Sequence, residues 1–96
     1  MTFKQSKADE NRVKVLKALA DVKRIDILRF IYHSKNHYTC GGVQEALSLN
    51  KSNQSYHLKI LQEANLIELQ RQGQSKVVII KEETFEEFIP GFLATL

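Results

Sequence analysis

Residues 38–61 read YTCGGVQEALSLNKSNQSYHLKIL, and this stretch decides the fold. Thr39 can cap a short helix, because its side-chain oxygen can accept an amide hydrogen that the first helical turn leaves unpaired. A polar turn at 48–50 ends this helix. The side chains expected to face inward from it are Val43, Ala46 and Leu47.

A second helix is expected over 51–64. Asn50 is suited to cap it, and Asn65 follows where the chain must leave it, since asparagine tolerates the left-handed conformation common at helix ends. Leu58 and Leu61 have the spacing of one apolar face, so we expect both to point into the core.

The opposite face of helix 51–64 is polar and carries little charge. Side chains of medium length with hydrogen-bonding groups can reach base edges in the major groove of DNA, which is wide enough to admit a helix. They gather toward the N-terminal end, which is the end that recognition helices insert. Taken alone, a polar outer face is ordinary for a surface helix. Its members are Lys51, Ser52, Asn53, Ser55, Tyr56 and Lys59.

After this helix the apolar period changes to that of a strand. Ile67 and Leu69 alternate with polar neighbours, and the β-branched run 77–80 can pair back on them across the turn 71–75, which contains Gly73. The turn gives the hairpin a basic, polar tip. That tip would carry Arg71, Gln72 and Gln74.

Two amphipathic helices precede the decisive stretch. Apolar residues at helical spacing predict them over 11–20 and 21–32, with Asp21 as the N-cap of the second. The apolar stripes are Val13, Leu16, Leu19 and Ala20 in the first helix, and Ile25, Leu28, Ile31 and Tyr32 in the second.

A last helix is expected near the C-terminus. Thr84 and Glu87 have the spacing of a capping box, and Pro90 should kink or split the helix because it lacks an amide hydrogen. In so small a domain, an apolar stripe beyond the needs of the core is most cheaply covered by a second copy of the chain, through helix 11–20. The expected dimer interface is Val13, Leu16, Ala20, Phe85, Phe88, Ile89, Phe92, Leu93 and Leu96.

The order of elements is therefore α-α-α-α-β-β-α. Two short helices with a tight turn between them, followed at once by a hairpin, predict a mainly α winged helix-turn-helix with a two-stranded wing. The 96 residues are enough for one domain, 1–96, and too few for two.

The charge distribution fits a nucleic-acid partner about as well as an ordinary solvated surface, and the composition fits a reducing cytoplasm. Residues 82–96 hold four acids and no base, so residues 1–81 carry 14 bases against seven acids. No apolar run approaches the roughly 20 residues of a membrane-spanning helix, and the first eleven residues lack the apolar region of a signal peptide. The single cysteine, Cys40, cannot form an internal disulfide.

Three blocks of the chain resemble the ArsR/SmtB family of bacterial repressors. LKALADVKRIDILRFI at 16–31 is similar to that family's helix-pair signature, SYHLKILQEANLI at 55–67 to its recognition helix, and RQGQSKVV at 71–78 to its wing. The blocks occur in the family's order and spacing, and the match covers most of the chain, about 15–80. The resemblance implies a homodimer that binds double-stranded operator DNA and that an effector releases.

The resemblance also implies roles for particular residues. Lys51, Ser52, Ser55 and Tyr56 match the family's DNA-facing recognition residues, and Arg71, Gln72 and Gln74 match its wing tip. Asn53 and Lys59 are added from helix geometry alone. Gln54 lies where the family usually has an apolar residue, so it could line the core edge or turn toward a phosphate.

Metal and cofactor chemistry find little support. The family's metal sensors have cysteines at the positions of Thr39 and Gly41 here, and Asp and His ligands on the last helix, which has no histidine in this chain. The set His33, His37 and Cys40 offers three possible ligands across a loop, whereas structural zinc takes four. We therefore expect no metal and no cofactor.

These observations predict a sequence-specific, DNA-binding transcriptional regulator, a dimeric repressor and not an enzyme. No general base lies near a nucleophile in a recognisable arrangement, and no glycine-rich loop could cradle a phosphate. The alternative is a winged-helix domain that docks a protein or RNA partner on its basic face. Tyr56 and the uncharged run around it favour base readout, and the sequence names no inducer.

Overall fold

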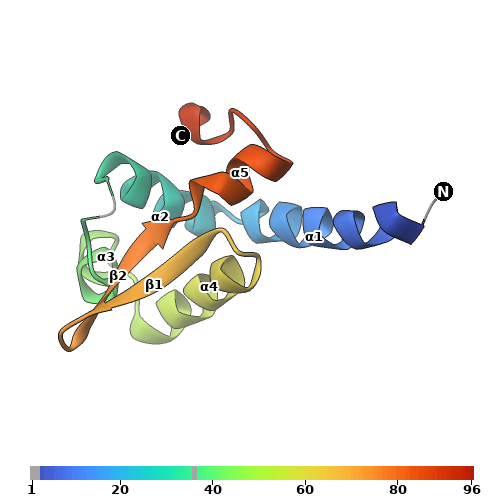
Figure 1. Ribbon diagram of the computed structural model, residues 1–96. Coiled ribbons are helices and arrows are strands. Elements are labelled where there is room, and N and C mark those ends of the chain that lie inside the picture. Colours follow the sequence, from blue (N-terminus) through green and yellow to red (C-terminus); the bar gives the residue numbers. More distant parts are fainter. Residues whose placement is uncertain (1–2, 36) are drawn as a thin grey trace.

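Five α-helices and one β-hairpin make up residues 3–35 and 37–96, which the computed structural model describes (Figure 1). The predicted winged helix-turn-helix order is confirmed, and the hairpin follows the helix-turn-helix pair directly. The elements are α1 (Phe3–Leu19), α2 (Val22–His33), α3 (Cys40–Ala46), α4 (Lys51–Glu63), β1 (Ile67–Gln72), β2 (Ser75–Ile80), α5 (Glu82–Phe88) and a final 3₁₀ turn (Leu93–Thr95).

All three N-caps expected for the internal helices are confirmed. The Asp21 carboxylate accepts hydrogen bonds from two amides of the first turn of α2, at 2.8 and 3.3 Å. The Thr39 hydroxyl accepts the amide of Gly42 at 3.0 Å, and the Asn50 side chain accepts the amide of Asn53 at 2.7 Å. Each cap satisfies an amide that the helix itself cannot pair, so the starts of α2, α3 and α4 are set locally.

Left-handed residues close two of the turns. Ser48, between α3 and α4, has φ 53°, and Asn65, after α4, has φ 61°, as its side chain allowed us to predict. Gly73 adopts φ 63° in the turn of the hairpin, a conformation that glycine reaches without steric cost. These turns hold α3 and the wing at either end of α4.

The hairpin is anchored at its base and exposed at its tip. Its antiparallel register pairs Ile67 with Ile80 at the base and Gln72 with Ser75 at the tip. The amide of Val78 also donates to the Tyr38 carbonyl at 3.2 Å, which ties β2 to the segment before α3. Residues 70–76 are all exposed, whereas Val77, Val78 and Ile80 are buried.

One apolar core lies between α2, α4 and the inner face of the hairpin, and α1 adds to it a face that the apolar stripe of residues 13–20 did not predict. Val15 and Ala18 are the buried residues of α1, whereas Val13 and Leu16 are about half exposed. Two apolar stripes lie side by side on this helix, and packing against α2 and α4 selected the other one. The helix is also longer than the predicted 11–20 and begins at Phe3.

Two other residues that were predicted to face inward do not do so fully. Ala46 of α3 is exposed, and Ile25 of α2 is only half-buried. Leu28 and Ile31 of α2 are buried as predicted, and the core also takes Ile27 and the charged residue Arg24 from this helix.

The C-terminal helix ends before Pro90, as predicted, but the prediction of a capping box at its start is wrong. Helix α5 ends at Phe88, and Pro90 and Gly91 redirect the chain before the 3₁₀ turn. The helix begins at Glu82 with no side-chain cap, because Thr84 is buried and its hydroxyl accepts a hydrogen bond from Asn65 Nδ2 at 3.2 Å. Within the described part of the chain, no helix is long and apolar enough to cross a membrane.

Candidate nucleic-acid interface

Helix α4 has one buried face and one open face. Its buried residues are Gln54, His57, Leu58 and Leu61, which turn the rest of the helix outward. Tyr56 is 60% exposed. All six residues predicted to face DNA from this helix are exposed: Lys51, Ser52, Asn53, Ser55, Tyr56 and Lys59.

The wing tip supplies the second group of predicted residues, and the structure adds a cation that sequence reasoning missed. Arg71, Gln72 and Gln74 are exposed, as expected. The register places Lys76 directly opposite Arg71, and Lys76 is also exposed. The glycine turn at Gly73 fixes this pairing, so counting back from the turn would have found Lys76.

These two groups lie on one side of the molecule. The N-terminal part of α4 and the tip of the hairpin both lie along the lower side of Figure 1, whereas α5 lies at the upper side. Residues 51–59 and 69–81 include five bases and no acid, and the four acids of α5 lie at the opposite end. The charge asymmetry seen in the sequence is therefore also a separation in space.

Gln54 and His57 point inward and are not part of the open face. Gln54 is 4% exposed, and its Nε2 donates to the Cys40 carbonyl at 2.6 Å, so it lines the core edge between α3 and α4. His57 is 7% exposed, with Nδ1 3.1 Å from Arg24 Nη1. Burial lowers the pKa of His57, because a charged imidazolium is disfavoured away from water.

The segment around Cys40 does not form a reactive or metal-binding cluster. Burial raises the pKa of the Cys40 thiol, which keeps it protonated and poorly nucleophilic. His33 is hydrogen-bonded through Nε2 to the Leu96 carbonyl at 2.8 Å, and His37 is exposed. In the ranges 3–35 and 37–96, no three His, Cys, Asp or Glu side chains are close enough to share a metal ion.

The residues expected at a dimer interface fall into three groups. Val13 and Leu16 of α1 and Ala20, which follows it, are exposed, and the neighbouring Val22 is 76% exposed. Four C-terminal residues are half-buried: Phe88, Ile89, Phe92 and Leu96.

Phe85 and Leu93 form the third group and correct the expected interface. Phe85 is 1% exposed and Leu93 6%, because both pack into the protomer's own core. The aromatic ring of Phe85 stacks on that of Phe92, with centroids 6.0 Å apart. The predicted interface residues that a single protomer leaves accessible are therefore fewer than the sequence pattern indicated, and they lie on or next to α1 and after Glu87.

Comparison with protein families gives a match over most of this fold. The family described as Helix-turn-helix domain matches residues 8–70, which span α1 to β1. An uncharacterized HTH-type transcriptional regulator of Bacillus subtilis (strain 168), YceK, is 42% identical over 96 residues, which is 100% of this chain and 95% of that protein.

Solved structures share the same architecture. The homodimeric winged helix-turn-helix DNA-binding domain Mb0332 of Mycobacterium bovis, a possible ArsR-family transcriptional regulator, superposes with a TM-score of 0.80 at 22% identity, covering 92% of this chain and 81% of its own. HlyU of Vibrio cholerae superposes with a TM-score of 0.69 at 26% identity, covering 92% of this chain and 90% of its own.

Proposed function

The chain belongs to the helix-turn-helix family of transcriptional regulators, and on that premise we propose that it acts as an ArsR-type repressor, binding operator DNA as a homodimer and repressing transcription. The observation that carries the proposal is the open face of α4, which combines exposed Tyr56 and neutral hydrogen-bonding side chains with a basic wing on the same side. This arrangement suits a duplex better than an acidic protein or RNA partner.

Helix α4 would enter the major groove by its N-terminal end. Ser52, Asn53 and Tyr56 are neutral and able to hydrogen-bond, so they would contact base edges. Lys51, at the helix start, would meet phosphate, where the free amides of the first turn also favour an anion. Burial of the opposite helix face fixes the rotation of α4, so the recognition side chains are presented without reorganisation.

The wing would hold the protein in register on the DNA. Arg71 and Lys76 lie side by side at the exposed end of a hairpin whose base is anchored to Tyr38. Phosphate contacts of this kind position a protein but carry no sequence information. Specificity would therefore depend on α4 and general affinity largely on the wing.

The second protomer would pack on α1. Residues 7–14 are all exposed, and the helix projects from the rest of the fold (Figure 1). Leu16 and Val22 add apolar surface that a single protomer leaves open. Residues after Glu87 would complete this interface. Because the proposed activity is binding at chromosomal operators, catalysis has no part in it, and the protein would act in the cytoplasm.

Selection of bound sequences from random duplex DNA tests the proposed function. We expect enrichment of a two-fold symmetric site whose half-sites lie about one helical turn, or a multiple of it, apart, because two symmetric copies of α4 must meet the same side of the duplex. A variant with Ser52 and Tyr56 both changed to alanine is the matched control and should enrich nothing. If the full chain enriches no sequence, the proposal is wrong.

Replacing Leu16 with glutamate tests the dimer separately. A charge buried across the two-fold axis would be repeated in the other protomer, so we expect a monomer by sedimentation at micromolar concentration. Ala46→Glu, at an exposed position of α3 far from α1 in Figure 1, is the control and should remain a dimer. If the unmodified chain were monomeric, the proposed assembly would be contradicted.

A further inference from the structure

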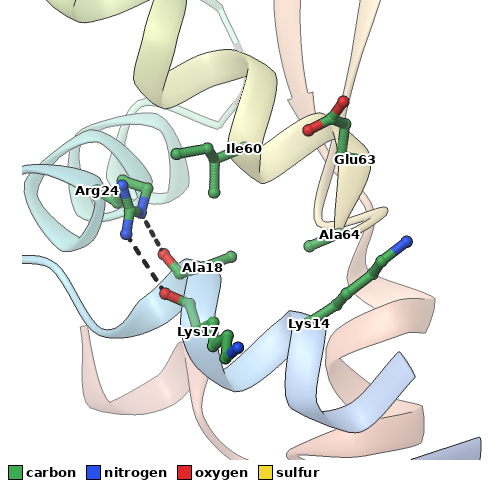
Figure 2. A pocket seen from close by; sticks show the side chains of 7 residues that line it. All are labelled: Lys14, Lys17, Ala18, Arg24, Ile60, Glu63 and Ala64. Atoms are coloured by element: carbon green, nitrogen blue, oxygen red, sulfur yellow. Dashed lines mark hydrogen bonds between the residues drawn. The ribbon is translucent and has the colours of Figure 1, made fainter. Parts of the chain in front are cut away.

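Arg24 is a buried cation that joins two helices through backbone atoms. It is 8% exposed, and its Nε donates to the Ala18 carbonyl at 2.6 Å while its Nη2 donates to the Lys17 carbonyl at 3.3 Å. Figure 2 shows both bonds at the edge of an open cleft of about 500 Å³ between α1 and α4. Carbonyls of the last turn of α1 lack intrahelical partners, and Arg24 supplies donors to them from the first turn of α2.

The third contact of Arg24 reaches the DNA-facing helix. Its Nη1 lies 3.1 Å from His57 Nδ1, across 33 positions of sequence. A guanidinium has donors only, so Nδ1 must be the acceptor, and the ring must carry its single proton on Nε2. The geometry therefore fits neutral His57 alone, because a proton on Nδ1 would face the guanidinium.

His57 is the sequence neighbour of the exposed recognition residue Tyr56. Tyr56 precedes it in α4, and the two rings meet edge-on with centroids 5.2 Å apart. His57 points inward and Tyr56 outward, so any rotation of α4 that moves one moves the other. Arg24 thus connects the end of α1, the start of α2 and the rotational setting of α4.

We propose that the Arg24–His57 contact is a positioning element that holds α4 in its DNA-binding orientation, and that protonation of His57 breaks it and weakens operator binding. The inference rests on the proposed function. According to this proposal, Arg24 and His57 influence DNA affinity although neither residue touches a base or a phosphate. Because α1 also carries the proposed dimer surface, the same contact links the orientation of α4 to the subunit interface.

The charges around His57 favour its neutral form at neutral pH. Burial is the main cause of its lowered pKa. From the α2 side, Asp21 acts to raise the pKa, whereas Arg24 and Lys23 act to lower it, and Asp21 lies 3.8 Å from Arg24 itself. The adjacent cleft is lined by two cations of α1, Lys14 and Lys17, and by one carboxylate of α4, Glu63. Acidification therefore adds a cation beside an existing one.

The pH dependence of operator binding tests the inference. For the unmodified chain, affinity should fall once His57 gains its proton, by up to about tenfold per pH unit for each proton that binding must expel. His57→Gln keeps an acceptor oxygen but cannot titrate, so it should bind the selected operator equally at pH 5.5 and pH 7.5. His37→Gln makes the same change at an exposed histidine and should keep the original pH profile.

Arg24→Lys tests the other partner. Lysine keeps the charge but cannot make the three divergent bonds of a guanidinium, so operator affinity should fall at every pH. If His57→Gln retains the pH profile of the unmodified chain, the inference is wrong. The same conclusion follows if Arg24→Lys leaves affinity unchanged.

A DNA-free measurement separates this inference from the proposed function. Nitrogen chemical shifts of the His57 ring at pH 7.5 should show an unprotonated Nδ1, and Arg24→Lys should move the α4 amide resonances as far as Tyr56. A protonated Nδ1, or unmoved resonances, would overturn the inference even if operator binding is normal. If no duplex binds, the proposed function fails, and these shifts alone decide whether Arg24 positions α4. If the His57→Gln variant does not fold, the same chemical shifts decide whether Arg24 positions α4.

Discussion

Replacing Arg71 with alanine should make DNA binding weaker and less sensitive to salt. Arg71 is exposed at the wing tip, opposite Lys76, and in residues 3–35 and 37–96 no carboxylate forms an ion pair with it. Its charge is therefore free to displace counterions from a phosphate. A free cation on an anchored hairpin is the best single position at which to measure the wing's contribution.

The size of the effect follows from the two-fold assembly. Each lost phosphate contact lowers the slope of log K against log salt by about 0.9, and a dimer loses two, so the slope should fall by about 1.8. Between 50 and 200 mM salt, this difference narrows the affinity gap between the unmodified protein and the variant by about 12-fold.

The assay is fluorescence anisotropy across a salt series, on the selected operator and on a scrambled duplex of equal length. Arg71→Ala should lose affinity on both duplexes alike, since phosphates are the same in each. Lys35→Gln removes a charge at the far end of α2 and should leave the slope nearly unchanged. If Arg71→Ala lost affinity only on the operator, with an unchanged slope, Arg71 would be a base contact and our assignment would be refuted.

Three further outcomes can be measured on the same protein. Tyr56→Ala should cost about 1–3 kcal/mol on the operator and relax preference at one position per half-site, because it removes an exposed base-contacting ring, whereas equal loss on operator and scrambled duplexes would assign Tyr56 to the backbone instead. Asn50→Ala removes the acceptor of the Asn53 amide and should lower the unfolding free energy by about 1 kcal/mol, as measured by chemical denaturation; Asn50→Ser, which keeps a capping oxygen, should recover most of it. The pKa of His57 in the folded protein lies below its ordinary value of about 6.5, so its contribution to stability is complete above that pH and is lost as pH falls below it. The thermal unfolding midpoint should therefore fall on acidification in the unmodified protein and not in His57→Gln. An equal fall in both proteins would assign the effect to another group.

Sequence patterns predicted the elements whose causes are local. Asp21, Thr39 and Asn50 are caps because a short side chain beside a helix start can accept an orphan amide wherever the rest of the fold lies. The exposure of residues such as Tyr56 followed with equal directness from the inward leucines of α4. Pro90 broke the last helix because its missing amide is a property of the residue itself.

Positions decided by packing could not be predicted in this way. Two adjacent stripes of α1 are apolar, and only contact with α2 and α4 selected Val15 over Leu16. Thr84 has the spacing of a cap, but Asn65, which lies 19 residues earlier, uses its hydroxyl in the folded chain. The buried role of Arg24 has no signal in a single sequence, because arginine on an amphipathic helix ordinarily lies in solvent.

The largely uncharged open face of α4 has a consequence for how the regulator would search a chromosome. Lys51 and Lys59 are the only cations among the six residues of α4 that we propose to face DNA, so discrimination between sequences would come from groups that displace no counterions. A rise in cellular ionic strength would then weaken attachment to operator and bulk DNA in nearly equal proportion, and the ratio between them would persist. Fewer repressor dimers would then be held on non-operator DNA, and each dimer would dissociate from such DNA sooner. Occupancy of the operator relative to non-operator sites would be kept under osmotic stress.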